Sequence, residues 1–517
     1  MANNVPGFYN STTVESLLAA ALTLRGADVH VLQCDRELPA CLRLKVGKTS
    51  PEMLATTSFR ETICTDCAAM VRPFEELGVT VHRMSALLDD GARTRCRDVA
   101  ATTPLESIPR HVLTLGDDEI PVGEHALAGA LRYFAIGQLD REPQGEVVLR
   151  RYFEAALRTA HAVHRLVRDV GIDRACFHHG IYIPQGVVAE VLRARSIPFS
   201  TWNVAYRKRC FLFSHEDTYH HTLLDEPTES WETMAFDDDD ERAIDAYLAS
   251  RWHGSQDWIY FHDTPDPALE TLVAATGIDP DRPIIGLLTN VVWDAQLHYR
   301  ANAFPSMLDW IEATIRLFAD RPAMRVLFRV HPAEIRGTQR SRQRAVEEIE
   351  RAFPRLPANV FVVGPESSVN TYAAMERCNA VLIYGTKTGV ELTSRGIPVI
   401  VAGEAWIRNK GLTIDARSRD EYRSIIAGLP LTESRLPAET VRRAKRYAYH
   451  FFFRRMIPVA AIEPLEGDAQ HAPVPFRVAI ESLRDLEPGR DAGLDTIVDG
   501  ISSGAPFIYP AEREGIR

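Results

Sequence analysis

The stretch Arg325-Val-Leu-Phe-Arg-Val-His-Pro-Ala-Glu334 joins a short apolar run to a polar turn. The run is rich in β-branched and aromatic residues and favours a buried strand, which Pro332 ends because proline cannot donate to a strand ladder. Similar runs lie at 284–288, 360–363, 380–384 and 398–402, and helical spacing separates them at 305–319, 341–352, 368–376 and 388–395. This alternation predicts a parallel sheet flanked by helices, as in a Rossmann-like domain.

A second alternating series precedes this one. Helical spacing at 14–24, 124–139, 146–170 and 185–195 alternates with strand-like runs at 27–32, 174–177 and 199–202. The series begins with a helix, so we expect that the natural start lies upstream or that the first strand is missing. A chain of 517 residues exceeds the roughly 250 to 300 residues that one core organises. We therefore expect two Rossmann-like domains, at 1–263 and 264–435, with helices at 436–517 that pack back on the body.

The charge balance limits the classes of partner. There are 59 Lys and Arg against 70 Asp and Glu, a net charge of −11, so the surface as a whole does not attract nucleic acid. No stretch approaches the roughly 20 apolar residues that cross a bilayer, and the first residues do not form a signal peptide. We expect a cytoplasmic protein. The basic, aromatic segment 442–455 is expected to pack against the body, with contact to anionic lipid at the inner membrane face as the alternative.

Two polar segments follow predicted strands of the second domain, at the edge where open α/β sheets bind ligands. The first places a histidine beside an arginine and a glutamate. The second opens a helix, where glycines allow close backbone approach and free amides bind phosphate oxygens, with a glutamate one turn later to accept ribose hydroxyls. A plain turn and a helix cap are the alternatives. The nucleotide-binding candidates are Arg329, His331, Glu334, Gly385, Thr386, Lys387, Thr388, Gly389 and Glu391.

Two side chains are candidates for catalysis. Asp294 follows the first strand of the second domain and could contact a sugar or act as a base, although a capping role explains it equally well. His179 follows the strand at 174–177 and could take a proton from an acceptor hydroxyl near neutral pH. A packed histidine is its structural alternative.

Four cysteines lie close together in sequence. Cys34, Cys41, Cys64 and Cys67 read C-x6-C-x22-C-x2-C, and the first pair brackets an irregular loop. Four thiolates, two of them at CxxC spacing, suit tetrahedral zinc, and an iron–sulfur cluster uses the same ligands. We place structural zinc first, the cluster second, and four unrelated buried thiols as the alternative.

Several of these segments resemble a known family. Leu288-Thr-Asn-Val-Val-Trp-Asp-Ala295, Arg329-Val-His-Pro-Ala-Glu334 and Tyr384-Gly-Thr-Lys-Thr-Gly-Val-Glu391, followed by Gly396-Ile-Pro-Val-Ile400, resemble the bacterial capsule polysaccharide biosynthesis proteins. The resemblance is best over about 280–415, is looser around 178–221, and does not include the cysteines. It implies a GT-B-like α/β fold, with two Rossmann-like domains around a cleft. It also implies that His331 and the segment 385–391 bind the phosphate and ribose of a nucleotide.

The resemblance implies a glycosyltransferase, in a family that includes transferases of Kdo from CMP-Kdo. We expect a nucleotide-sugar donor, a glycan or lipid-linked glycan acceptor, and no cofactor required for transfer. The alternatives are a CDP-polyol phosphotransferase of the same fold and a nonenzymatic polysaccharide-binding or assembly protein. Both alternatives keep the cleft but change or remove the chemistry in it.

Overall fold

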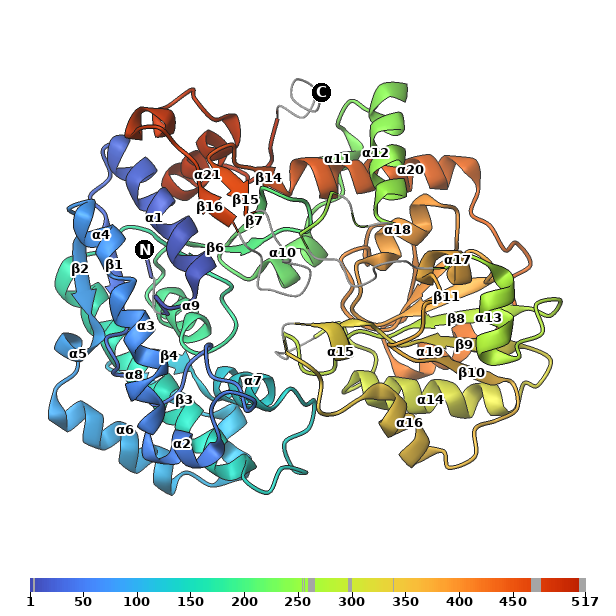
Figure 1. Ribbon diagram of the computed structural model, residues 1–517, viewed down its shortest axis with the longest axis horizontal. Helices are drawn as coiled ribbons and strands as arrows, with labels where there is room; N and C mark the ends of the chain where they lie inside the picture. The colour runs from blue at the N-terminus through green and yellow to red at the C-terminus, as the bar shows by residue number, and fades with distance from the viewer. Residues whose placement is uncertain are drawn as a thin grey trace.

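The structure is a computed structural model of the chain (Figure 1). It describes residues 1–2, 5–252, 254, 256–258, 266–295, 300–337, 339–465 and 476–510. The expected domain boundary at 263/264 lies outside the described residues. Below, the first half means the described residues up to 258, the second half means 266–435, and the C-terminal segment means 436–510.

The sheet of the second half has six parallel strands in the order β10-β9-β8-β11-β12-β13. In chain order these are β8 (Ile284–Leu288), β9 (Arg325–Arg329), β10 (Val360–Val363), β11 (Ala380–Ile383), β12 (Val399–Val401) and β13 (Ile414–Asp415). The predicted strands are confirmed, and the sequence analysis missed only β13 of this sheet. Strand order reverses between β8 and β11, so the ligand crevice of such a fold is expected at the carboxyl ends of these two strands.

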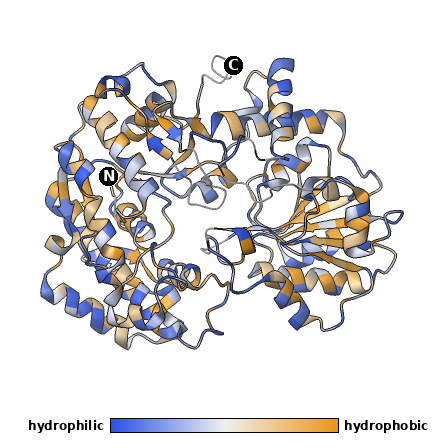
Figure 2. Cartoon of the chain, in the orientation of Figure 1, coloured by the Kyte–Doolittle hydropathy of each residue, from blue (hydrophilic) through white to orange (hydrophobic). Residues whose placement is uncertain are grey.

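Helices flank this sheet, and Figure 2 shows its strands as the most hydrophobic part of the second half. The helices are α13 (Leu269–Thr276), α14 (Met307–Ala319), α15 (Ala333–Arg336), α16 (Ala345–Ala352), α17 (Thr371–Met375), α18 (Thr388–Ser394) and α19 (Arg419–Ala427). Local caps set several starts: the side chains of Ser306, Asn370 and Ser418 accept bonds from backbone N–H groups of α14, α17 and α19. Such caps satisfy amides that have no partner inside the helix.

The main sheet of the first half is mixed rather than parallel. Its order is β14-β7-β6-β5, with β5 (Ala175–His178) parallel to β6 (Phe199–Val204) and β7 (Cys210–His215) antiparallel to β6. The expectation of a parallel sheet is therefore corrected at β7. The connection at 205–209 is too short for the crossover that a parallel pair needs, so β6 and β7 form a hairpin.

Residues 1–2 lie between two pieces of sheet. β1 (His30–Gln33) and β2 (Thr80–Arg83) form a separate parallel pair. The Met1 amino group donates to His30 O at 2.7 Å, Leu32 N donates to Met1 O at 3.0 Å, and Ala2 N donates to Cys176 O at 3.1 Å. These bonds connect β1 to β5 through the first two residues, and α1 (Tyr9–Leu24) follows directly.

Helices supply most of the remaining first half, which the 26-residue helix α8 (Gly145–Val170) crosses. The others are α2 (Pro51–Thr56), α3 (Ile63–Ala69), α4 (Arg72–Glu76), α5 (Met84–Leu87), α6 (Asp90–Thr102), α7 (Gly123–Phe134), α9 (Gln185–Ala194), α10 (Tyr219–Asp225), α11 (Glu229–Glu232) and α12 (Asp238–Ser250), with the hairpin β3 (Val112–Leu115) and β4 (Asp118–Pro121). α10 to α12 bury apolar side chains in the same core as β11 and α18. These three helices thus pack with the second half, although they precede the expected boundary.

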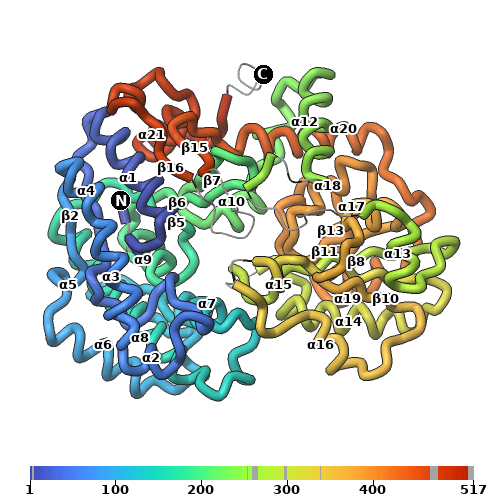
Figure 3. Tube along the Cα trace, in the orientation of Figure 1, coloured from blue at the N-terminus to red at the C-terminus, as the bar shows by residue number. Residues whose placement is uncertain are grey.

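The C-terminal segment returns to the first half (Figure 3). α20 (Ala438–Tyr449) packs on α12 and α18, β14 (Ile457–Pro458) pairs with β7, and α21 (Ala492–Ser503) packs on α1; β15 (Ile462–Pro464) and β16 (Phe476–Val478) form a hairpin between them. The phenylalanines at 451–453 are at most 3% exposed. The packing expected for the basic, aromatic segment is therefore confirmed, and these rings do not face outward toward a membrane. Among the described residues, no helix is long and apolar enough to cross a bilayer.

Candidate active site

A cavity of about 360 Å³ lies at the carboxyl ends of β8, β9 and β11. Its walls on the second half come from the turns after these strands, at 288–295, 329–333 and 384–388. The first half contributes Tyr206, Tyr219, His220 and Arg251. This is the crevice expected at the switch point of the sheet, and its volume falls in the roughly 300 to 1,000 Å³ range of small-molecule sites.

His331 lies in the turn after β9 and lines the cavity. Its backbone N–H donates to the Thr289 hydroxyl at 3.0 Å, which ties the turns after β8 and β9 together. The Ala333 N–H donates to Nδ1 of the ring at 3.0 Å. Because Nδ1 accepts this bond, the proton of the neutral ring sits on Nε2, which can then donate to an anionic ligand.

Arg329, the last residue of β9, also lines the cavity. It is 2% exposed, and its guanidinium donates to the carbonyls of Gly364 at 2.6 Å and Ser367 at 3.2 Å. Burial lowers its pKa to about 10, so the group remains charged at neutral pH. The structure thus places a fixed positive charge beside His331.

The segment after β11 forms the facing wall of the cavity. Gly385, Thr386, Lys387 and Thr388 line it. A Cβ at Gly385 would come no closer than 3.8 Å to its neighbours, so the backbone there is open to a ligand. At Gly389 a Cβ would meet Ile383 at 2.6 Å, so this glycine serves helix packing instead.

Lys387 points toward the first half and the core. Its ammonium lies 4.6 Å from the Tyr206 ring centre and donates to Glu391 at 2.7 Å. Burial lowers the pKa of Lys387, with the nearby Arg251 charge adding to that effect and Glu391 opposing it.

Glu391 does not line the cavity among the described residues, contrary to its expected contact with ribose. Its carboxylate accepts bonds from Lys387 and from the Tyr372 hydroxyl and lies 3.2 Å from the Arg251 guanidinium. Burial raises its pKa, but the charges of Arg251 and Lys387 outweigh that effect and lower it to about 2. Glu391 therefore holds two cations that reach the cavity wall, which makes it a positioning residue.

Asp294 is exposed in the cavity wall after β8. The Tyr182 hydroxyl, from the first half, donates to its Oδ1 at 2.9 Å and accepts a bond from Ala295 N at 2.7 Å. One carboxylate oxygen is therefore oriented by a residue that is itself fixed. Such an arrangement suits a carboxylate that takes a proton from a bound hydroxyl.

His179 lies behind the cavity wall rather than in it. It sits after β5 with φ 66°, and its ring packs against Tyr182, Tyr219 and His220. Burial, with the charges of neighbouring groups, holds its pKa well below the usual range. Its neighbour His220 does line the cavity, and burial lowers the pKa of His220 to about 3. Both rings are poor proton acceptors at neutral pH, which favours Asp294 over His179 as the base.

The turns after β8, β9 and β11 lie within one segment of the chain that matches a family model. Residues 274–428 match the family model described as capsule polysaccharide biosynthesis protein. This part of the chain is similar to the capsule polysaccharide biosynthesis proteins. This segment covers all six strands of the second sheet and every candidate nucleotide-binding residue, and it confirms the resemblance found in the sequence.

Solved structures similar to the chain share little sequence with it. Two are Thermosulfurimonas dismutans KpsC proteins. The one titled beta Kdo 2,4 transferase has 14% identity and TM-score 0.35, and covers 54% of this chain and 80% of its own. The one titled beta Kdo 2,7 transferase has 12% identity and TM-score 0.34, and covers 63% and 88%. The S. aureus MnaA–UDP co-structure has 12% identity and TM-score 0.26, and covers 56% and 77%. No curated protein matches the chain.

Glu334 is buried away from the cavity. It is 0% exposed, and its carboxylate accepts a bond from Ala345 N at 3.2 Å, at the start of α16. Burial raises its pKa to about 7, against the opposing effects of the Ala345 N–H and Arg344. This placement replaces the expected contact with nucleotide by a structural bond that closes the loop before α16.

We expect this buried carboxyl to make stability depend on pH. Its pKa is raised in the folded state, so folding binds a proton between about pH 4.5 and 7, and stability falls as pH rises through that window. Glu334→Gln should remove this dependence, so the variant should gain a few degrees in Tm over the wild type as pH rises. Thermal unfolding measured across this range checks it, with the exposed Glu350→Gln as control. Parallel curves for wild type and Glu334→Gln would contradict the assignment.

Arg251 and Glu404 are among the cavity residues that the sequence analysis did not single out. Arg251 is the C-cap residue of α12, and its guanidinium lies 3.2 Å from the Glu391 carboxylate. Because the two residues are far apart in the sequence, no local sequence pattern indicates this contact. Glu404 follows β12 and accepts a bond from Ala301 N at 2.8 Å, and burial raises its pKa. Its place directly after the predicted strand at 398–402 was the usable signal.

The four cysteines of the C-x6-C-x22-C-x2-C pattern, Cys34, Cys41, Cys64 and Cys67, lie outside the cavity. All are free thiols, and no group of three or more His, Cys, Asp or Glu among the described residues is placed to hold a metal ion. The expected tetrahedral zinc site is therefore not seen. The pKa of Cys34 is raised to about 12, mainly by burial, with Cys64 and Cys67 adding to that effect and backbone hydrogen bonds opposing it.

Proposed function

We propose that the chain is a glycosyltransferase that moves a sugar from a nucleotide donor to a hydroxyl of a capsular or surface glycan. The observation that carries this proposal is the cavity at the switch point, where Arg329, His331 and Lys387 lie together with the exposed carboxylate of Asp294. A nucleotide sugar carries its phosphate next to the sugar that is transferred. Cations for the phosphate and a base for the acceptor in one cavity fit that substrate class. CMP-Kdo is the first donor to test, because the family includes Kdo transferases.

The residues divide the reaction between them. The acceptor oxygen attacks the anomeric carbon, and the bond from that carbon to the phosphate oxygen breaks. The hydroxyl proton passes to the Asp294 carboxylate. The electron pair leaves with the nucleotide phosphate, whose growing charge is stabilised by Nε2–H of His331, the Lys387 ammonium and the fixed Arg329 charge.

His331→Ala should slow nucleotide release from the donor more than it weakens donor binding. The lost hydrogen bond strengthens as phosphate charge develops, so the loss should be about 2 kcal/mol of transition-state stabilisation, roughly thirtyfold in rate. Steady-state kinetics measures kcat and KM separately, and we expect kcat to fall more than KM rises. His331→Gln keeps a neutral N–H donor and should recover part of the rate. Equal rates for wild type and His331→Ala would remove His331 from the mechanism.

The overall proposal is tested by a nucleotide screen followed by donor turnover. A nucleotide that binds only the folded state raises Tm, so CMP, CDP, UDP and GDP are compared first. Sugar donors of the nucleotide that binds are then assayed for nucleotide release. Lys387→Ala should reduce the Tm shift if the ligand occupies the cavity. Binding of CDP with release of CMP from a polyol donor would indicate the phosphotransferase, and no turnover with every donor would favour the nonenzymatic alternative.

A further inference from the structure

The Tyr182 hydroxyl reaches from the first half to the base of the proposed reaction. It donates to Asp294 Oδ1 at 2.9 Å and accepts a bond from Ala295 N at 2.7 Å. The tyrosine is 2% exposed and packs in one apolar cluster with Leu42 of the first half and Ala295 of the second. A single hydroxyl therefore fixes both the carboxylate and the backbone beside it, and it comes from the other half of the chain.

The turn before Tyr182 has an unusual backbone. His179 has φ 66° and Gly180 has φ 75°, so both lie in the left-handed region. A Cβ at Gly180 would meet the Thr201 side chain at 2.8 Å. The His179 N–H donates to Trp202 O at 2.8 Å, which fixes the turn to the neighbouring strand. A non-glycine residue in this region is strained, and such strain is concentrated at functional sites.

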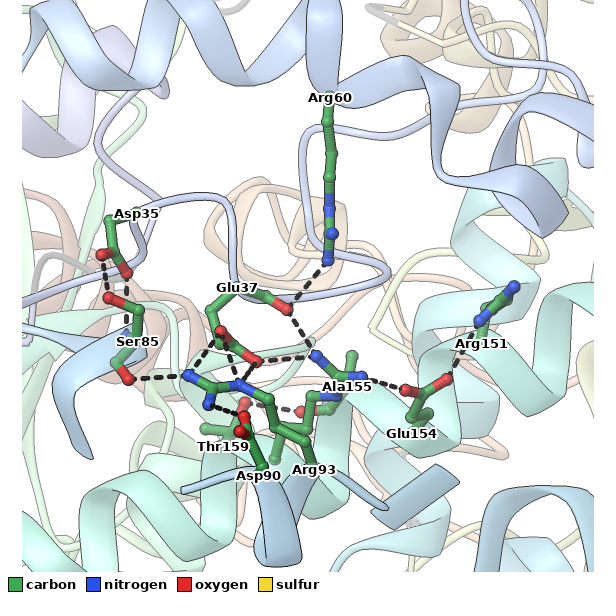
Figure 4. Close-up of polar contacts among 11 residues, drawn as sticks. Asp35, Glu37, Arg60, Ser85, Asp90, Arg93, Arg151, Glu154, Ala155 and Thr159 are labelled. Carbon is green, nitrogen blue, oxygen red and sulfur yellow. Dashed lines mark hydrogen bonds and ion pairs between the residues drawn. The ribbon is translucent and has the colours of Figure 1, made fainter. Parts of the chain in front are cut away.

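Buried charges fix the first-half loop at 34–42 (Figure 4). The Glu37 carboxylate is 8% exposed and accepts bonds from Arg158 of α8 at 2.7 Å and from Arg93 of α6 at 3.2 Å. Arg60 donates to the Glu37 carbonyl at 3.1 Å. Separating buried charges of this kind is costly, so the loop is held against both helices.

This loop in turn holds the segment around Tyr182. The Leu42 N–H donates to Ile183 O at 2.9 Å, and Arg132, in the last turn of α7, donates to Leu42 O at 2.7 Å. The Arg132 guanidinium lies 5.2 Å from the Tyr182 ring centre. The ring is therefore fixed on the first half. Its place on Asp294 depends on how the two halves are held together.

The two halves also meet where 132–142, between α7 and α8, lies against 339–348, at the start of α16. We call this contact the latch. The Gly137 N–H donates to Gln343 Oε1 at 2.8 Å, and Gln343 Nε2 donates to Gln138 Oε1 at 3.3 Å. In Figure 1 the latch lies on the opposite side of the molecule from α20. It is thus separate from the core that α10 to α12 share with the second half.

Two ion pairs complete the latch. Arg141 pairs with Glu348 at 2.7 Å, and Arg342 pairs with Glu142 at 2.9 Å. The two arginine side chains are 48% and 45% exposed, so water and salt screen both pairs. Polar contacts between domains allow relative motion more readily than a large apolar interface does. The latch is therefore suited to open and close.

The latch also contacts the turn that carries Asp294. A Cβ at Gly137 would lie 3.1 Å from Val292 O, so the two backbones are in close contact. Trp293 Nε1 donates to Ser341 Oγ at 3.0 Å, which ties the same turn to the second-half side of the latch. Val292 and Trp293 directly precede Asp294. Closure of the latch therefore sets the position of this turn relative to the first half.

We propose that Tyr182 is a positioning residue for the transfer reaction, and that the latch holds it on Asp294 by keeping the two halves together. This inference rests on the proposed function. With the latch closed, the Asp294 carboxylate is oriented toward the acceptor hydroxyl. With the latch open, Tyr182 leaves with the first half and the carboxylate loses its orientation. The base is therefore complete only when both halves enclose the cavity.

The first test is a double-mutant cycle at Tyr182 and Asp294. Tyr182→Phe should lower kcat by about tenfold or more, the usual contribution of a hydrogen bond to a charged group, with KM nearly unchanged. In the Asp294→Asn background no carboxylate remains to be oriented, so the same change should alter kcat less than about twofold. Tyr152→Phe is the matched control. It removes a buried first-half hydroxyl that donates to the Cys41 carbonyl, and it should keep the wild-type kcat.

The second test reverses the charges of the latch. Arg141→Glu combined with Arg342→Glu places like charges opposite Glu348 and Glu142, so the latch should open. The radius of gyration measured by small-angle X-ray scattering should rise, and kcat should fall toward that of Tyr182→Phe. In this open variant, Tyr182→Phe should have little further effect. Adding Glu142→Arg and Glu348→Arg restores opposite charges across the latch and should recover most of both quantities.

Each other outcome overturns a stated part of the inference. Equal kcat for Tyr182→Phe and the wild type, or the same loss in the wild-type and Asp294→Asn backgrounds, would remove the positioning role. An unchanged radius of gyration in the charge-reversed variant would remove the latch. Failure of the proposed function is a different result, a wild type that turns over no donor. It would end the positioning role, whereas scattering needs no turnover and would still decide on the latch.

Discussion

Asp294→Asn is expected to lower the rate of nucleotide release from the donor by about 100-fold to 10,000-fold, the usual contribution of a general base. The asparagine keeps the bond from the Tyr182 hydroxyl to Oδ1, which is 2.9 Å long in the wild type. It cannot take the proton of the acceptor or of water. Donor affinity should therefore change little, and kcat should carry the loss. Initial rates over a range of donor concentrations measure the two separately.

Among the described residues, two other carboxylates line the cavity, those of Asp257 and Glu404. Asp257 forms an ion pair with Arg251, so its carboxylate is less suited to take a proton from a bound hydroxyl. Glu404 accepts a bond from Ala301 N and lies 3.8 Å from His221. Glu404→Gln should therefore keep most of the activity. A larger loss in Glu404→Gln than in Asp294→Asn, with both variants folded, would move the base to Glu404.

The sheet of the second half could be predicted because its strands are short, apolar and bounded by turn residues. Val360–Val363 and Ile284–Leu288 have the predicted bounds. Buried parallel strands produce continuous apolar runs, which are easy to recognise. β13 (Ile414–Asp415) was missed because two residues at a sheet edge carry no pattern. In the first half the sequence analysis predicted no strand at 210–215, where β7 forms the second strand of a hairpin with β6.

The candidate site could be predicted only where the chemistry is local in sequence. His331 and Lys387 follow strands directly, so their position at the cavity edge follows from topology. Glu334 and Glu391 follow the same strands but point into the core, because the direction of a side chain one turn into a helix depends on tertiary packing. Arg251 lies 140 residues from Glu391 in the chain, and long-range pairing of this kind leaves no sequence signal.

Glu391→Gln should test that long-range pairing through stability. The Glu391 and Arg251 side chains are 2% and 5% exposed, so removing the carboxylate leaves buried cations without their counter-charge. Breaking such a pair costs about 3 kcal/mol or more, and we expect a clear fall in Tm and in the urea midpoint. Lys387 should also lose its orientation, because its 2.7 Å bond is to the same carboxylate. Nucleotide binding should weaken although Glu391 does not line the cavity.

Glu376→Gln is the matched control for that change. Glu376 pairs with Arg395 at 3.0 Å and is 39% exposed, so its loss should cost less than about 1 kcal/mol. Comparing the two variants separates the loss of one carboxylate from the loss of a buried counter-charge. If Glu391→Gln were as stable as Glu376→Gln and bound nucleotide like the wild type, Arg251 and Lys387 would not depend on Glu391. The cations of the cavity wall would then be held by their other contacts, which include Asp257 and the Tyr247 hydroxyl for Arg251 and the Tyr206 ring for Lys387. A ribose contact for Glu391 predicts the opposite pattern, with binding weakened and stability unchanged, so the two measurements together decide between the roles.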